Sequence, residues 1–89
     1  MRNEGMSRSF SAWKNETLAC LVQLERKYKE DEAVKTLDTL IKKLLRLRKR
    51  DLSVFLVLLK EASRQVPEVL DLTPSPHEVA EWFREEGEE

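Results

Sequence analysis

The side chains that enzymes most often use for nucleophilic attack or proton transfer near neutral pH occur once each, as Cys20 and His77. A thiol becomes a nucleophile when a neighbouring base or cation stabilises its thiolate. Helical spacing instead places Cys20 among apolar residues such as Trp13 and Leu24, so we expect a buried structural thiol. His77 stands beside Glu78 at the start of a predicted helix, where we expect a solvent-exposed imidazole.

Other patterns that carry chemistry are missing from the sequence. It has no glycine-rich phosphate-binding loop and no group of cysteine, histidine and acidic residues at metal-ligand spacing. We therefore predict that the protein is not an enzyme and that it uses no cofactor, metal ion or small-molecule substrate.

The clearest charged feature is a basic run of six cations within nine residues, with no acidic residue among them. Its members are Lys42, Lys43, Arg46, Arg48, Lys49 and Arg50. Four interpretations stay open: contacts to nucleic-acid phosphates, a nuclear-import signal, an acidic protein partner, or a solvated helix end whose cations balance the helix dipole. No aromatic residue is interleaved with the run, which disfavours binding of single-stranded nucleic acid.

The C-terminal segment has the opposite charge. Residues 78–89 contain six glutamates and one cation, Arg84. Complementary charges on separate helices predict steering between helices of one chain or between two copies. Because single surface ion pairs contribute roughly 0–1 kcal/mol, this pairing would orient helices more than stabilise them.

The most apolar stretch is 52–59, which we interpret as the start of a central helix. Its core-facing stripe includes Leu52, Phe55, Leu56 and Leu59, at the spacing of one helical face. A second apolar seam, formed by Val54, Val57 and Leu58, is not explained by that stripe. The last helix offers few large apolar groups to cover it, so we predict self-association or a helix-in-groove contact centred on Val57.

Apolar periodicity predicts an all-α fold, a compact bundle of about four helices near residues 11–29, 32–47, 52–65 and 76–86. The second and third helices are separated by so few residues that we expect a tight antiparallel hairpin. Pro67 ends the third helix, and residues 67–72 are expected to form a short turn. The expected core includes Leu24, Leu40, Leu44, Leu56 and Leu59.

Polar residues mark the predicted helix starts. Ser9 or Ser11 is expected to cap the first helix, Asp31 the second and Asp51 the third. Ser75, followed by proline and by a glutamate at the third helical position, has the pattern of a capping box. The outer face of the last helix is expected to carry Glu78, Glu81 and Glu85.

Length and composition predict one domain at 10–86, preceded by a flexible segment at 1–9 and followed by a frayed acidic tail at 87–89. The formal net charge of −1 gives no general attraction to nucleic acid or to an anionic membrane. The longest apolar run is far shorter than a membrane span, and a single cysteine fits a reducing compartment. We therefore expect an intracellular protein, cytoplasmic or nuclear, with no membrane partner.

Together these patterns favour a non-catalytic protein–protein interaction module, an adaptor or assembly subunit that binds another protein or a second copy of itself. The expected contact residues are the seam Val54, Val57 and Leu58 and the basic run 42–50. The alternative is a helical nucleic-acid-binding domain that contacts phosphates through the same basic run.

Overall fold

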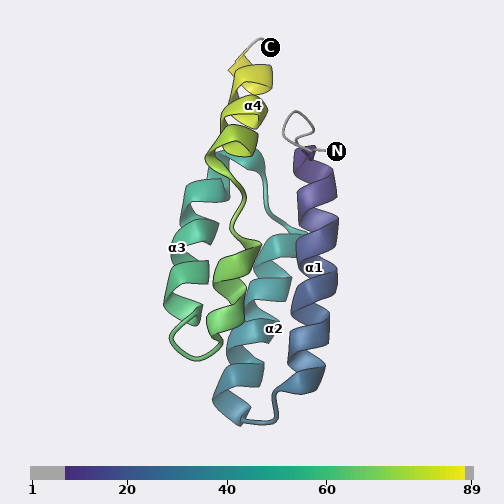
Figure 1. Cartoon of the computed structure of the whole chain (residues 1–89), viewed down its shortest axis with the longest axis vertical. Coiled ribbons are helices and arrows are strands. Elements are labelled where there is room, and N and C mark those ends of the chain that lie inside the picture. The colour runs from purple at the N-terminus through teal and green to yellow at the C-terminus, as the bar shows by residue number, and fades with distance from the viewer. Residues whose placement is uncertain (1–7, 88–89) are drawn as a thin grey trace, which may run out of the picture.

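The computed structural model describes residues 8–87, and these residues form an all-α bundle without strands, as predicted (Figure 1). Four α-helices and two short 3-10 helices follow one another along the chain. They are α1 Phe10–Lys27, α2 Asp31–Leu45, η1 Lys49–Asp51, α3 Leu52–Ala62, η2 Pro67–Leu72 and α4 Pro76–Gly87. The predicted segment 1–9 and tail 87–89 lie largely outside the described residues.

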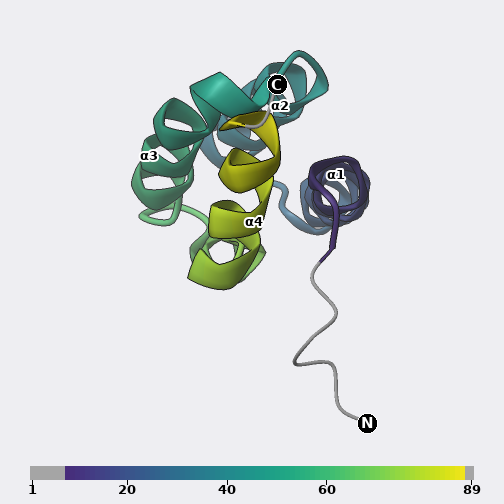
Figure 2. The same cartoon turned by 90° about the horizontal axis from the view of Figure 1, so that it is seen from above.

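The first three helices run up and down side by side. α1 descends in Figure 1, α2 returns beside it and α3 descends again, so the predicted antiparallel hairpin of α2 and α3 is confirmed. α1 and α2 pack most closely, whereas α3 is shared between α2 and η2. α4 extends beyond one end of the bundle and lies between α1 and α3 when viewed from above (Figure 2).

Two of the predicted helix caps are confirmed by hydrogen bonds. The Ser9 hydroxyl accepts from the backbone N–H of Ala12 at 3.0 Å, which caps α1. At α4, the Ser75 hydroxyl accepts from the Glu78 N–H, and the Glu78 carboxylate accepts from the Ser75 N–H, each at 3.1 Å. These reciprocal bonds form the capping box.

The predicted aspartate caps are wrong in detail. α2 begins at Asp31 itself, after Glu30, and α3 begins after Asp51, but neither Glu30 nor Asp51 makes a side-chain cap bond. α3 is also shorter than expected, because it ends at Ala62 rather than near Gln65. The 3-10 turn η1 precedes α3 and provides tight i→i+3 bonding there, such as Asp51 N–H to Arg48 C=O at 2.9 Å.

An aromatic cluster joins α1, α3 and α4. Trp13 and Trp82 are both buried, with ring centroids 5.6 Å apart, and Phe10 and Phe55 pack edge-on against one or other of them. The Trp13 Nε1–H donates to the Leu72 carbonyl at 2.8 Å, so this indole is buried without losing its hydrogen bond. The cluster explains how α4 is held although it covers only one end of the bundle.

The aliphatic core matches most of the predicted residues. Leu40, Leu44 and Leu59 are fully buried, whereas Leu24 and Leu56 are only partly buried at the edge of the core. One further expectation from helical spacing is wrong, because Cys20 is exposed rather than buried. Leu45 is also 61% exposed, and Phe83 on α4 is 41% exposed.

Glu78 also departs from its predicted place on the outer face of α4. Its side chain is buried and accepts two hydrogen bonds from the Arg8 guanidinium, at 2.7 and 2.9 Å. Trp82 completes this contact, because its Nε1–H donates to the Arg8 carbonyl at 2.8 Å. Arg8 and the capping box together fix the start of α1 to the start of α4.

Candidate functional site

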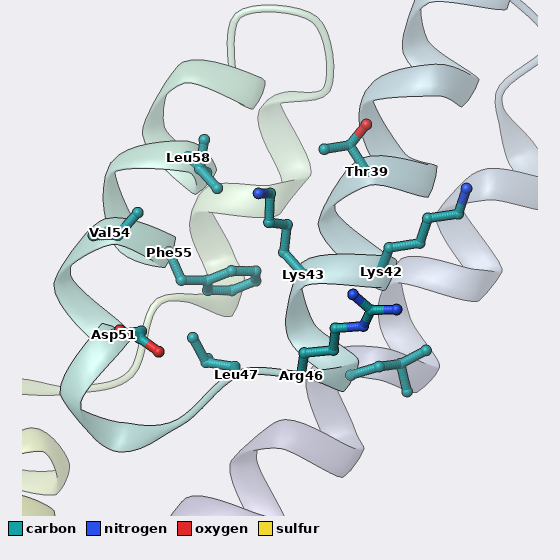
Figure 3. Close-up of a pocket in the computed structure, with 10 residues that line it drawn as sticks. Thr39, Lys42, Lys43, Arg46, Leu47, Asp51, Val54, Phe55 and Leu58 are labelled. Carbon is teal, nitrogen blue, oxygen red and sulfur yellow. The ribbon is translucent and has the colours of Figure 1, made fainter.

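A groove with a volume of about 690 Å³ lies between α2 and α3 (Figure 3). It is lined by Thr39, Lys42, Lys43, Leu45, Arg46, Leu47, Asp51, Val54, Phe55 and Leu58. We call this feature the α2–α3 groove. It contains one end of the predicted basic run and most of the predicted apolar seam.

Each wall of the groove is one face of a helix. On the α2 side, the lining residues follow the i, i+3, i+4, i+7 spacing that places side chains in a row. They are Thr39, Lys42, Lys43 and the C-cap residue Arg46. The opposite wall repeats that spacing with Asp51, Val54, Phe55 and Leu58. The groove is therefore the valley between a largely basic stripe on α2 and a largely apolar stripe on α3.

The apolar wall is open to solvent. Val54 is 63% exposed and Leu58 is half-buried, so no other described segment covers them. Phe55 is buried and points from α3 toward α2, where it forms part of the floor (Figure 3). A floor held by core packing keeps the groove in shape when nothing is bound.

The cations on the opposite wall differ in their surroundings. Lys43 points from α2 toward α3, whereas Lys42 points away from the groove in Figure 3 and pairs with Asp38 at 3.2 Å. Lys43 and Arg46 are exposed and make no ion pair with another side chain in the described range 8–84. These two charges are thus available to a bound molecule.

The segment between α2 and α3, which we call the linker, closes one end of the groove and is fixed from two sides. The Lys14 ammonium donates to the Leu47 carbonyl at 2.9 Å, which satisfies an acceptor left over where α2 ends. The Lys49 ammonium donates to the Trp82 carbonyl at 3.3 Å and so reaches α4. Lys49 therefore has a structural contact, and the position of the linker does not depend on a ligand.

A smaller hollow of about 270 Å³ continues along the same pair of helices. It shares Thr39 and Leu58 with the α2–α3 groove and extends past Glu61 to Gln65. Along α3, the lining residues from Val54 to Glu61 span about 10 Å at 1.5 Å per residue. The whole depression is elongated along the helices.

The predicted contact residues divide into two groups. Lys42, Lys43, Arg46, Val54 and Leu58 line the groove, whereas Val57, Arg48, Lys49 and Arg50 do not. Val57 is nevertheless 56% exposed, but it lies outside the groove that Val54 and Leu58 line.

Sequence reasoning did not find the other lining residues. Thr39 and Phe55 were recognisable from their helical spacing to residues already selected, because they complete the two stripes. Leu47 was placed at the end of the predicted second helix, but it lies in the linker, and its position depends on how the chain turns between α2 and α3.

Two carboxylates elsewhere have low pKa values for structural reasons. Hydrogen bonds from Arg8 lower the pKa of Glu78 to about 2. The Tyr28 hydroxyl and the Lys27 ammonium lower the pKa of Glu68 to about 2. Both glutamates are paired between segments distant in sequence, as expected for bonds that hold a fold together.

Among the side chains that the structure describes, no three metal-ligating groups gather at one place. Within the same range, no helix is long and apolar enough to cross a membrane. Comparison of the chain with models of protein families, with curated proteins and with solved structures finds no match. The properties of the α2–α3 groove therefore carry the functional argument.

Proposed function

We propose that this protein is a non-catalytic interaction module that binds another protein in the α2–α3 groove. The observation that carries the proposal is the open apolar wall of Val54 and Leu58 facing the cations Lys43 and Arg46 across one depression. Exposed apolar residues rimmed by polar groups are typical of protein interaction sites.

The fold supplies the rigidity that such a site needs. Both walls are single helical faces, and the floor residue Phe55 packs on Trp13 in the core. The linker is held by Lys14 and Lys49. A preformed groove loses little conformational entropy on binding, which favours affinity.

The alternative function, nucleic-acid binding through the basic run, is less well supported. A surface that contacts phosphates has no use for the open aliphatic wall, and Asp51 at the groove would repel a phosphate. The only aromatic lining residue, Phe55, is buried, so it offers no face on which a base could stack.

The proposal is tested by co-precipitation from a native lysate, with and without nuclease treatment, using wild-type protein and two single-residue variants. Val54→Glu places a charge in the groove, and Val57→Glu makes the same change on the same helix outside the lining residues. We expect Val54→Glu to lose most of the captured partner and Val57→Glu to keep most of it. Equal capture by all three folded proteins, or capture that nuclease abolishes, would contradict the proposal.

A further inference from the structure

The walls of the α2–α3 groove also specify what kind of segment fits there. We propose that the occupant is an acidic amphipathic helix of a partner protein, with its apolar stripe against α3 and its acidic residues beside α2. This inference rests on the proposed function and names the partner's chemistry.

Charge complementarity determines where the acidic residues lie. Lys43 and Arg46 stand on the α2 wall, whereas the α3 wall carries Asp51. A ligand with acidic groups on both flanks would meet like charge at Asp51. The groove therefore fits a helix that is acidic on the flank facing α2 and apolar beneath.

The shape of the groove favours a helix over other backbone conformations. A helix satisfies its own backbone hydrogen bonds, whereas a peptide that binds by strand addition needs a strand edge, and the described part of the chain has none. The apolar stripe of α3 between Val54 and Leu58 rises about one turn, and the hollow continues to Glu61. About two turns of a ligand helix match that length.

A second copy of this chain is a poorer occupant than a different protein. Its own acidic helix is α4, whose Trp82 and Glu78 are buried in contacts within the chain. Phe83 is the only large apolar side chain that is exposed on the described part of α4. One such residue cannot make the stripe that the α3 wall requires.

The test uses three synthetic helical peptides that share a fluorescent label and differ in one property each. The first has leucines at i, i+3/i+4 and i+7 and glutamates on one flank. The second has lysines in place of those glutamates, and the third has serines in place of the leucines. Binding is measured by fluorescence anisotropy at low and high salt, with full-length protein.

We expect wild-type protein to bind the first peptide only, and salt to weaken that binding. The double variant Lys43→Glu/Arg46→Glu should bind the first peptide at least about tenfold more weakly and should gain affinity for the lysine peptide. The matched control Arg26→Glu/Lys29→Glu makes the same change in net charge at exposed positions far from the groove. It should stay within about twofold of wild type, because distant exposed charges are screened.

Three results would overturn the inference. They are failure of the glutamate peptide to bind, equal binding of the lysine peptide to wild type, or equal loss in both charge variants. The proposed function survives those results if Val54→Glu still abolishes capture of a protein partner, and it fails separately if that variant has no effect. Displacement of the glutamate peptide by duplex DNA, or dimerisation of the wild type that Val54→Glu abolishes, would assign the groove to a different occupant.

Discussion

At the scale of single residues, the most informative side chain is Glu78, because it serves two structures at once. It closes the capping box of α4 and receives the guanidinium of Arg8 from the segment before α1. Hydrogen bonds from Arg8 hold the pKa of Glu78 at about 2, below its value of 4.5 in a free side chain. The ionised form is thus favoured by folding.

This shift predicts a pH dependence of stability with a defined sign. Because the folded pKa is depressed, Glu78 contributes stability above pH about 4.5, and that contribution is lost as the pH falls toward 2. Allowing for solvent screening of the partly exposed Arg8, we expect about 2 kcal/mol at neutral pH. Urea unfolding of Glu78→Gln between pH 2 and 7 should show a lower unfolding free energy at pH 7 and a flatter pH profile than wild type.

The exposed Glu61→Gln is the control, because the Glu61 side chain makes no hydrogen bond or ion pair with another described side chain. Its profile should follow that of the wild type. If Glu78→Gln has the same profile too, Glu78 does not link α1 to α4 in solution.

A second prediction at this scale concerns the core. Leu59 is fully buried, so Leu59→Ala should reduce the unfolding free energy by roughly 2–5 kcal/mol through lost burial and a residual cavity. Val57→Ala, two residues away on the exposed face, should change it by less than about 1 kcal/mol. Denaturant unfolding of both variants checks this, and similar losses would show that helix α3 is placed wrongly.

At the scale of elements, the sequence predicted the helices well because their signals are local. Apolar periodicity and the Ser75 capping box each act within a few residues, and both are confirmed in the structure. Pro67 opens the short turn expected at residues 67–72, which is η2, but it does not end α3. The end of α3 was placed too late, since residues 63–65 have good helix formers and only the packing of the following turn reveals the stop at Ala62.

Long-range contacts were not predictable in the same way. Nothing near Arg8 indicates that it reaches Glu78, because 70 positions separate the two residues. The prediction that Cys20 is buried failed for a related reason. Helical spacing places Cys20 at the edge of the apolar stripe of α1, but which edge is covered depends on how α2 packs against α1. Half of the residues that line the groove were predicted from the apolar and basic stripes in the sequence. That the two stripes face each other across one groove could be seen only in the three-dimensional structure.

The exposed wall of α3 leads to a prediction for the element as a whole. Val54 and Val57 are both more than half exposed, so glutamate at either position should leave the fold intact. The unfolding free energy of each variant should stay within about 1 kcal/mol of wild type. Circular dichroism and urea unfolding measure this, and unfolding of either variant would show that the seam is covered in solution.

At the scale of the whole molecule, charge is distributed unevenly although the net charge is −1. The basic run gathers at the junction of α2 and α3, and the glutamates concentrate toward the C-terminal end of the chain. This arrangement predicts attraction for acidic partners at one place rather than general adhesion to polyanions.

The salt dependence of binding distinguishes the nucleic-acid alternative from protein binding in the groove. If the protein works through the groove, labelled duplex DNA and RNA should show no stable mobility shift even at low salt. Nucleic-acid binding would instead give an affinity that falls steeply with salt and disappears in the double variant Arg48→Glu/Arg50→Glu, which keeps the contact of Lys49 with Trp82. In that variant the groove residues Lys43 and Arg46 are unchanged, so capture of a protein partner should persist.

The most direct measurement of the central claim is site-specific photo-crosslinking inside cells. A photoreactive phenylalanine analogue is placed at Val54, in the groove, or at Gln23, which is exposed on α1 away from it. The account predicts a discrete protein adduct from position 54 that resists nuclease and is missing from position 23. Adducts of equal yield from both positions, or an adduct at 54 that consists of nucleic acid, would contradict it.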